Sequence, residues 1–235
     1  MKQPQKAAAQ ELISFLSAYQ LHELLKNPQL IEQIKKSFKR YYPLLLLERA
    51  IERRAPWPQE AKTTFFHLYF KETISDVCQA MVLSSQGYYK PAQLSLRSGL
   101  ENWIRCVGLA QDQSVLSLKS VYELIDLVRS TPIISGGGFP KQYFDTLRNR
   151  YSQLCGYVHT TNAAHMALTT AAGSFPRYMA KEANSTFHAI EEVCSRITWI
   201  FCIIAKDTFR GMHHTHFDIV SDALPNKLKA HLHRD

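Results

Sequence analysis

The sequence predicts an all-α protein folded as an antiparallel helical bundle, and three observations favour that class. Apolar residues recur in the long segments at the three- and four-residue spacing of a helix. Glycine is scarce, with only 9 residues, three of which are adjacent at positions 136–138. No convincing strand alternation or internal repeat occurs, and the frequent glycine-rich turns that β-sandwiches need are missing.

Length and composition narrow the class further. A chain of 235 residues suits one domain or at most two small ones, and 46% hydrophobic residues supply ample material for a core. No apolar run reaches the roughly 18 residues of a membrane span. The first ten residues lack the apolar stretch of a secretory signal. We therefore expect a soluble, cytoplasmic protein without a membrane partner.

Cysteine usage supports a reducing compartment. The count is odd, the spacing matches no disulfide framework, and every cysteine lies within an apolar helical pattern. Buried free thiols are therefore expected at Cys78, Cys106, Cys155, Cys194 and Cys202.

Residues 1–55 are expected to form N-terminal helices that are partly basic. Helical patterns cover about 7–26 and 28–54, and Pro43 predicts a break or kink in the second. The net charge of +8 favours anionic partners, with RNA among them. The cluster Lys35, Lys36, Lys39 and Arg40 is either a solvated helix face or a phosphate-contacting patch.

Residues 56–211 are expected to form the main bundle, bounded by Pro56 and Pro58. A helical hairpin is predicted from helices at about 59–85 and 91–110, with Gly87 ending the first. A helical segment at about 115–129 and a flexible loop at 130–139 follow.

The C-terminal half continues with helices at about 141–157, from Asn162 onward and at 178–210, the last ended by Gly211. Residues 212–235 are expected to be a loosely structured, His-rich tail. His213, His214 and His216, with Asp218 nearby, form a dense set of potential metal ligands. Catalytic zinc sites need a rigid frame, so neither a metal nor a cofactor is expected.

The helix at 141–157 carries the residues of greatest chemical interest. Its core stripe consists of Phe144, Leu147, Tyr151, Leu154 and Val158. Arg148, Ser152, Cys155 and His159 lie along one flank, and Arg150 falls on the other. Arg148 and His159 are nearly eclipsed but about 16 Å apart along the axis. They can line one groove or face a second copy of the chain without touching.

A polar row lies on the preceding hairpin. Arg97, Glu101 and Arg105 are spaced four residues apart, so Glu101 can pair with either arginine. The row flanks a core stripe of Leu96, Leu100, Trp103 and Val107. If this helix packs against the one at 141–157 through the two core stripes, Arg97 and Glu101 are expected to converge with Tyr157 and His159.

Three segments of the chain carry a resemblance to a known family. They read GYYKPA at 87–92, LRSGLE at 96–101 and RNRYSQLCGYVH at 148–159. Together they resemble the HEPN superfamily of helical-bundle proteins, over roughly residues 59–205. Members often carry an Arg, four to six variable residues and a His. By this resemblance His159 is the motif histidine and Arg150 or Arg148 the motif arginine, although eight or ten residues separate them here.

The resemblance implies a homodimer in which these motifs meet as a metal-independent endoribonuclease site. It implies RNA as the partner, a role as a toxin or anti-phage effector, and a possible partner protein from a defence or toxin–antitoxin system. Histidine can serve as base or acid near neutral pH, and arginine can stabilise charge on a phosphate. The candidate residues are His159, Arg150, Arg148, Glu101, Arg97 and Tyr157.

Three alternatives stay open at this point. The superfamily also contains members that do not cleave RNA, so the chain is alternatively a non-catalytic module that binds RNA, a nucleotide or a protein. It is alternatively a structural subunit of a larger assembly. For single residues, His159 can instead favour a helix C-terminus through its charge, and Arg97–Glu101 can be a surface ion pair of small energetic value.

Overall fold

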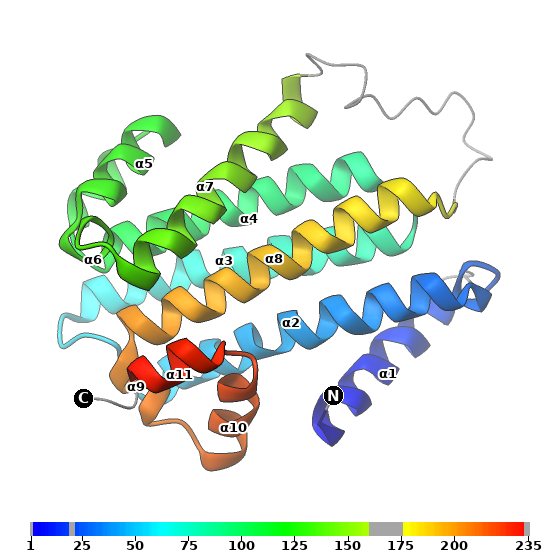
Figure 1. The fold of residues 1–235 in the computed structure, drawn as a ribbon, viewed down its shortest axis with the longest axis horizontal. Coiled ribbons are helices and arrows are strands. Elements are labelled where there is room, and N and C mark those ends of the chain that lie inside the picture. The colour runs from blue at the N-terminus through cyan, green and yellow to red at the C-terminus, as the bar shows by residue number, and fades with distance from the viewer. Residues whose placement is uncertain (1, 19–21, 160–175, 233–235) are drawn as a thin grey trace.

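The structure is a computed structural model that describes residues 2–18, 22–159 and 176–232, without the side chains of residues 16, 18 and 159. Throughout these ranges the regular structure is helical and no strand occurs, which confirms the predicted all-α class (Figure 1). The elements are α1 (Gln3–Ala18), η1 (Leu24–Lys26), α2 (Pro28–Arg53), α3 (Glu60–Ser85), α4 (Tyr89–Leu109), η2 (Gln113–Ser117), α5 (Val121–Ser130), α6 (Pro132–Ser135), α7 (Gly138–His159), α8 (Ala180–Ile204), α9 (Lys206–Arg210), α10 (His214–Asp222) and α11 (Asn226–Leu232).

The bundle is built from five long helices. Helix α3 packs along α4, α2 along α8, and α7 against both α4 and α8. Aromatic rings from three of them meet at the centre, where the Phe70 ring centroid lies 5.6 Å from that of Trp103 and 5.2 Å from that of Phe201. All three side chains are fully buried, and each burial contributes roughly 2–3 kcal/mol to folding.

The α3–α4 hairpin forms as the sequence predicts. Gly87 adopts a positive φ of 82° at the turn, a conformation that favours glycine. A Cβ at this position would lie 2.1 Å from the backbone oxygen of Arg177. Only a residue without a side chain therefore allows the turn to pack this closely against Arg177. The four stripe residues of α4, Leu96, Leu100, Trp103 and Val107, are all buried.

Helix α2 is continuous through Pro43, so of the break or kink that this proline predicts, the break does not occur. The helix runs without a break from Pro28 to Arg53. Pro43 removes one backbone hydrogen bond, but buried neighbours on both sides, including Tyr41, Leu44 and Leu47, hold the segment in place. Tertiary packing therefore outweighs the local effect of the proline.

The segment predicted as a flexible loop, 130–139, contains a short helix. Helix α6 begins at Pro132, an N-terminal position where the missing N–H has no cost, and α7 begins at Gly138. The helix predicted for 178–210 is divided at Ala205 into α8 and α9. The first predicted helix, 7–26, is likewise divided into α1 and η1. The helix predicted from Asn162 lies outside the described residues.

The prediction of a loosely structured tail is wrong. Residues 214–222 and 226–232 form α10 and α11, which bury Ile219, Val220, Leu228 and Leu232. The indole Nε1 of Trp199 donates a hydrogen bond to the Ala223 oxygen at 2.9 Å and so ties this region to α8. Helices of nine and seven residues are too short to be stable alone, which is why their pattern is faint in the sequence.

The structure bears on the expectations about cysteines and about membrane-spanning segments. The five cysteines are free thiols, of which Cys106, Cys194 and Cys202 are buried and Cys78 and Cys155 half-buried. None of the helices in the described ranges is both long and apolar enough to cross a bilayer.

Candidate functional site

Arg97 joins α4 to α7 through two residues that are one helical turn apart. Its Nη2 donates a hydrogen bond to Tyr151 Oη at 2.7 Å, and its Nε approaches Cys155 Sγ at 3.4 Å. The guanidinium carbon also lies 5.0 Å from the centre of the Tyr151 ring. Because these contacts come from opposite helices, they set the register of α4 against α7.

Glu101 was predicted to be able to pair with either flanking arginine, and it lies within ion-pair distance of both. Glu101 lies 3.9 Å from Arg97 Nη1 and 3.5 Å from Arg105 Nη2. Arg105 also donates to the Leu118 oxygen at 2.9 Å. The row is partly buried, so it connects α4 to the segment before α5 as well as to α7.

Tyr151 is held in its neutral form. Burial raises the pKa of its phenol, and this effect exceeds the opposing effect of the Arg97 charge. At neutral pH the hydroxyl therefore accepts from Arg97 without losing its own proton. Tyr151 is suited to positioning Arg97 and is unsuited to acting as a general base.

A cleft of about 300 Å³ opens beside these contacts, between α5 and α7. Helix α5 comes close because Gly108 of α4 has no side chain, and a Cβ there would lie 2.6 Å from a methyl carbon of Val115 and 3.1 Å from one of Val128. We call this the α5–α7 cleft. Its lining residues are Tyr122, Ile125, Asp126 and Arg129 from α5 and Arg148, Asn149, Tyr151, Ser152 and Cys155 from α7.

The cleft carries excess positive charge. Two arginines, Arg129 and Arg148, face one acidic residue, Asp126, and no ion pair joins it to either arginine. In the part of the chain that the structure describes, Arg148 Nη2 donates only to the side-chain oxygen of its neighbour Asn149, at 3.3 Å. The Tyr122 ring at the rim is 75% exposed. The arrangement presents two guanidinium groups and an aromatic face to a ligand.

Arg150, the alternative motif arginine, points to the opposite side of α7. Its Nε and Nη2 both lie 2.7 Å from Glu192 Oε2 on α8, and its Nη1 donates to Gln153 at 2.7 Å. Both members of the ion pair are largely buried, with side chains 18% and 22% exposed. Arg150 therefore holds α7 on α8, and of the two candidates only Arg148 lines the cleft.

The structure brings together only part of the predicted set. Arg97 contacts α7 at Tyr151 and Cys155, which lie two turns and one turn before the predicted partner His159, and Glu101 is connected to them through Arg97. His159 is the last residue of α7, and its side chain lies outside the described part of the chain. Tyr157, one turn past Gln153, is half-buried.

Tyr151, Tyr122 and Arg129 are site residues that helical spacing alone does not reveal. Tyr151 belongs to the predicted core stripe and lies in the core, but its hydroxyl reaches the polar edge of that stripe. Tyr122, Asp126 and Arg129 share one face of α5 by their spacing of four and three residues. An exposed tyrosine on the polar face of an amphipathic helix was the available signal.

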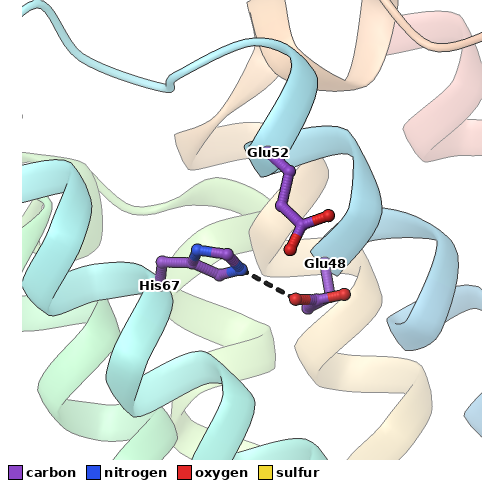
Figure 2. Close-up of side chains that lie close together, drawn as sticks. All are labelled: Glu48, Glu52 and His67. Atoms are coloured by element: carbon purple, nitrogen blue, oxygen red, sulfur yellow. Dashed lines mark hydrogen bonds and ion pairs between the residues drawn. The ribbon is translucent and has the colours of Figure 1, made fainter.

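The described residues contain one group of three potential metal ligands within 4.8 Å of one another: Glu48, Glu52 and His67 (Figure 2). His67 Nε2 lies 2.8 Å from Glu48 Oε1. Lys71 Nζ lies 3.4 Å from Glu48 and 3.5 Å from Glu52. A metal cation bound to this group would have to neutralise the same two carboxylates. The lysine already performs that electrostatic role, so the group is explained as an ion-pair network between α2 and α3.

Comparisons with known proteins place no constraint on this site. No protein-family model, curated protein or solved structure matches the chain.

Proposed function

We propose that the chain is a HEPN-like RNA-targeting protein that holds single-stranded RNA in the α5–α7 cleft and cleaves it without a metal ion. The observation that carries the proposal is the pair Arg129 and Arg148, which face one cleft beside the exposed ring of Tyr122 and form no ion pair with any described carboxylate. Guanidinium groups bind phosphate oxygens bidentately, and aromatic rings stack on unpaired bases.

The geometry also favours single strands over duplex. A cleft of about 300 Å³ accommodates one nucleotide unit and is far too small for a helix of paired bases. The unstacked bases of single-stranded RNA can turn outward and stack on an aromatic side chain. Tyr122 at the rim and the arginines on the two walls suit that mode of binding.

Cleavage is assigned to His159 because it follows Cys155, a residue of the cleft wall, by one helical turn. The 2′-oxygen of the RNA forms a bond to phosphorus while a base takes the 2′-hydroxyl proton. The bond to the 5′-oxygen breaks, and an acid protonates that leaving oxygen. The products are a 2′,3′-cyclic phosphate and a 5′-hydroxyl, and no oxidant or metal enters the balance. Histidine is suited to either proton transfer near neutral pH.

Within this proposal the other candidates have different roles. Arg148 binds the phosphate, while Arg97, Glu101 and Tyr151 position α4 against α7 without touching RNA. Arg150 is assigned to stability. The resembled superfamily assembles its site from two subunits, so the proposal includes a homodimer, with the 42% exposed Val158 offering an apolar contact near His159. A toxin or anti-phage role, acting with a partner protein, belongs to the same proposal.

Binding is tested with a fluorescein-labelled single-stranded RNA in EDTA, measured by anisotropy over a range of salt concentrations. Replacing both Arg129 and Arg148 by Gln removes two phosphate contacts. The slope of log affinity against log salt is expected to become shallower by about 1.4, and affinity at physiological salt to fall on the order of tenfold. A matched control removes two exposed positive charges elsewhere, at Lys181 and Lys227, and is expected to keep the slope within experimental error. Equal slopes in all three proteins would rule out the cleft as the binding site.

Cleavage is tested by incubating wild type, His159→Ala and the control His188→Ala with the same RNA in EDTA. We expect fragments with 2′,3′-cyclic phosphate ends from wild type and the control, and intact RNA from His159→Ala. Cleavage by His159→Ala at the wild-type rate would reject the assignment of His159. RNA left intact by every protein that binds it would instead identify a non-catalytic binding module.

A further inference from the structure

A second concentration of positive charge lies where α10 begins against the last turns of α2. Arg49 and Arg53 are spaced four residues apart on α2, and His213 and His216 come from the start of α10. These four residues are called the Arg–His cluster. Figure 1 shows α10 and α5 at opposite edges of the bundle, so the cluster is separate from the α5–α7 cleft.

Helix α2 sorts its charges by face, which leaves the cluster without counter-charge. Glu48 and Glu52 point to α3, where His67 contacts Glu48 (Figure 2) and Lys71 Nζ lies 3.4 Å from Glu48 and 3.5 Å from Glu52. Arg49 and Arg53 are exposed and make no ion pair within the described ranges. The two guanidinium groups therefore lie on one face of α2, while the acidic residues beside them in sequence form ion pairs on another face.

The neighbouring elements add positive charge instead of balancing it. Arg54 lies against Gly211, and α10 has no acidic residue in its first turn and no side-chain cap at His213. The carboxylates of Asp207 on α9 and Asp218 on α10 form no ion pair with the cluster. The C-terminal end of α2 supplies a partial charge of only about −0.5, which is too small to balance two arginines.

His216 sits close enough to the arginines to respond to their charge. Burial lowers the pKa of His216, and the positive charges of Arg53, His213 and Arg49 lower it further. The His213 ring centroid lies 5.9 Å from that of His216 and 4.1 Å from that of exposed His214. His213 Nδ1 is hydrogen-bonded to Thr215 Oγ1 at 2.9 Å, so Nε2 is the ring nitrogen that can donate to a ligand.

We propose that the Arg–His cluster is a pH-dependent binding site for a phosphate group or an equivalent dianionic oxyanion. Arg49 and Arg53 supply the pH-independent part of the attraction through charge-assisted hydrogen bonds. His216 and His213 add positive charge when they are protonated. Because the pKa of His216 is lowered in the empty protein, a bound anion raises it, and by linkage the affinity for the anion increases as the pH falls below neutral. This site is independent of the proposed RNA-binding function.

Sulfate is the probe, because it stays a dianion between pH 6 and pH 8 and any pH dependence then comes from the protein. Binding is measured by calorimetry at constant ionic strength. Wild type is expected to bind sulfate about fivefold more tightly at pH 6 than at pH 8. Arg53→Gln is expected to bind about tenfold more weakly at both pH values, and His216→Gln to lose most of the pH dependence.

Two controls make the result decisive. The variant Lys181→Gln with Lys227→Gln removes two exposed positive charges that belong to neither site, and it is expected to bind sulfate as wild type does. Arg49→Gln provides a second test if Arg53→Gln unfolds, as checked by circular dichroism. Wild-type affinity in both folded arginine variants, or unchanged pH dependence in His216→Gln, would overturn the proposal.

A further experiment distinguishes between RNA and a small phosphorylated molecule as the natural source of the phosphate. Arg49→Gln with Arg53→Gln is tested against the labelled RNA used for the cleft. If RNA phosphates occupy the cluster, the salt slope for RNA becomes shallower in this variant. If the ligand is a small phosphorylated molecule, RNA binding is unchanged while sulfate binding is lost.

Discussion

The two faces of α7 treat arginine in opposite ways. Arg150, on the face toward α8, is held at 2.7 Å by Glu192 and by Gln153. Arg148, two residues earlier on the face toward α5, has within the described ranges a hydrogen bond only to the side chain of its sequence neighbour Asn149, and it lines a cleft. The same residue type on one helix is thus structural on one side and available to a ligand on the other.

The difference shows that ionic partners, more than residue type or position in a motif, separate a structural arginine from a binding one. A partly buried ion pair lowers the energy of the fold only while both charges are present. An arginine without a carboxylate partner retains its full attraction for an external anion. Helix α2 repeats the pattern, because Glu48 and Glu52 are paired with α3 residues while Arg49 and Arg53 have no ionic partner among the described residues.

The greatest loss is expected from removing the ion pair between Arg150 and Glu192. Arg150→Met leaves Glu192 partly buried without its partner, and the free energy of unfolding is expected to fall by about 2 kcal/mol in chemical denaturation. RNA affinity of the folded variant is expected to stay within twofold of wild type. Adding Glu192→Leu removes the unpaired charge and should restore part of the stability. Weaker RNA binding without a loss of stability would reverse the roles assigned to Arg148 and Arg150.

A smaller effect is expected from the aromatic part of the cleft. Tyr122→Ala removes the stacking surface, and RNA affinity is expected to fall about tenfold, or about 1.4 kcal/mol. Since no charge is lost, the salt slope should stay that of wild type, in contrast to the arginine variants. Tyr122→Phe keeps the ring and should bind almost as wild type does. A salt slope that changes in Tyr122→Ala would contradict stacking as its role.

The smallest effect is expected at the contact that joins the two helices behind the cleft. Tyr151→Phe keeps the ring beneath Arg97 but removes the hydroxyl that accepts its 2.7 Å hydrogen bond. Stability is expected to fall by about 1 kcal/mol, measured as the denaturant midpoint at constant slope. RNA affinity should change little, because the side chain positions Arg97 and does not bind phosphate. Unaltered stability would show that this hydrogen bond does not hold α4 on α7.

Much of the fold was predictable because it rests on local patterns. The stripes of α4 and α7, the turn at Gly87 and the pairing of Glu101 with Arg97 and Arg105 all follow from helical spacing within one segment. The failures share a cause. Pro43 is tolerated, and α10 and α11 form, because distant helices bury their side chains, and no local pattern records that burial.

The candidate site likewise has features that follow from local helical spacing and features that depend on packing between helices. Helical spacing in the sequence already places Arg148 and Arg150 on different flanks of one helix, and Arg97 and Glu101 on another. That α5 faces Arg148 and Glu192 faces Arg150 follows from the folded structure alone, since partners across helices depend on packing between segments far apart in the chain. A side chain's chemistry is encoded locally, whereas its electrostatic surroundings exist only once the helices have assembled.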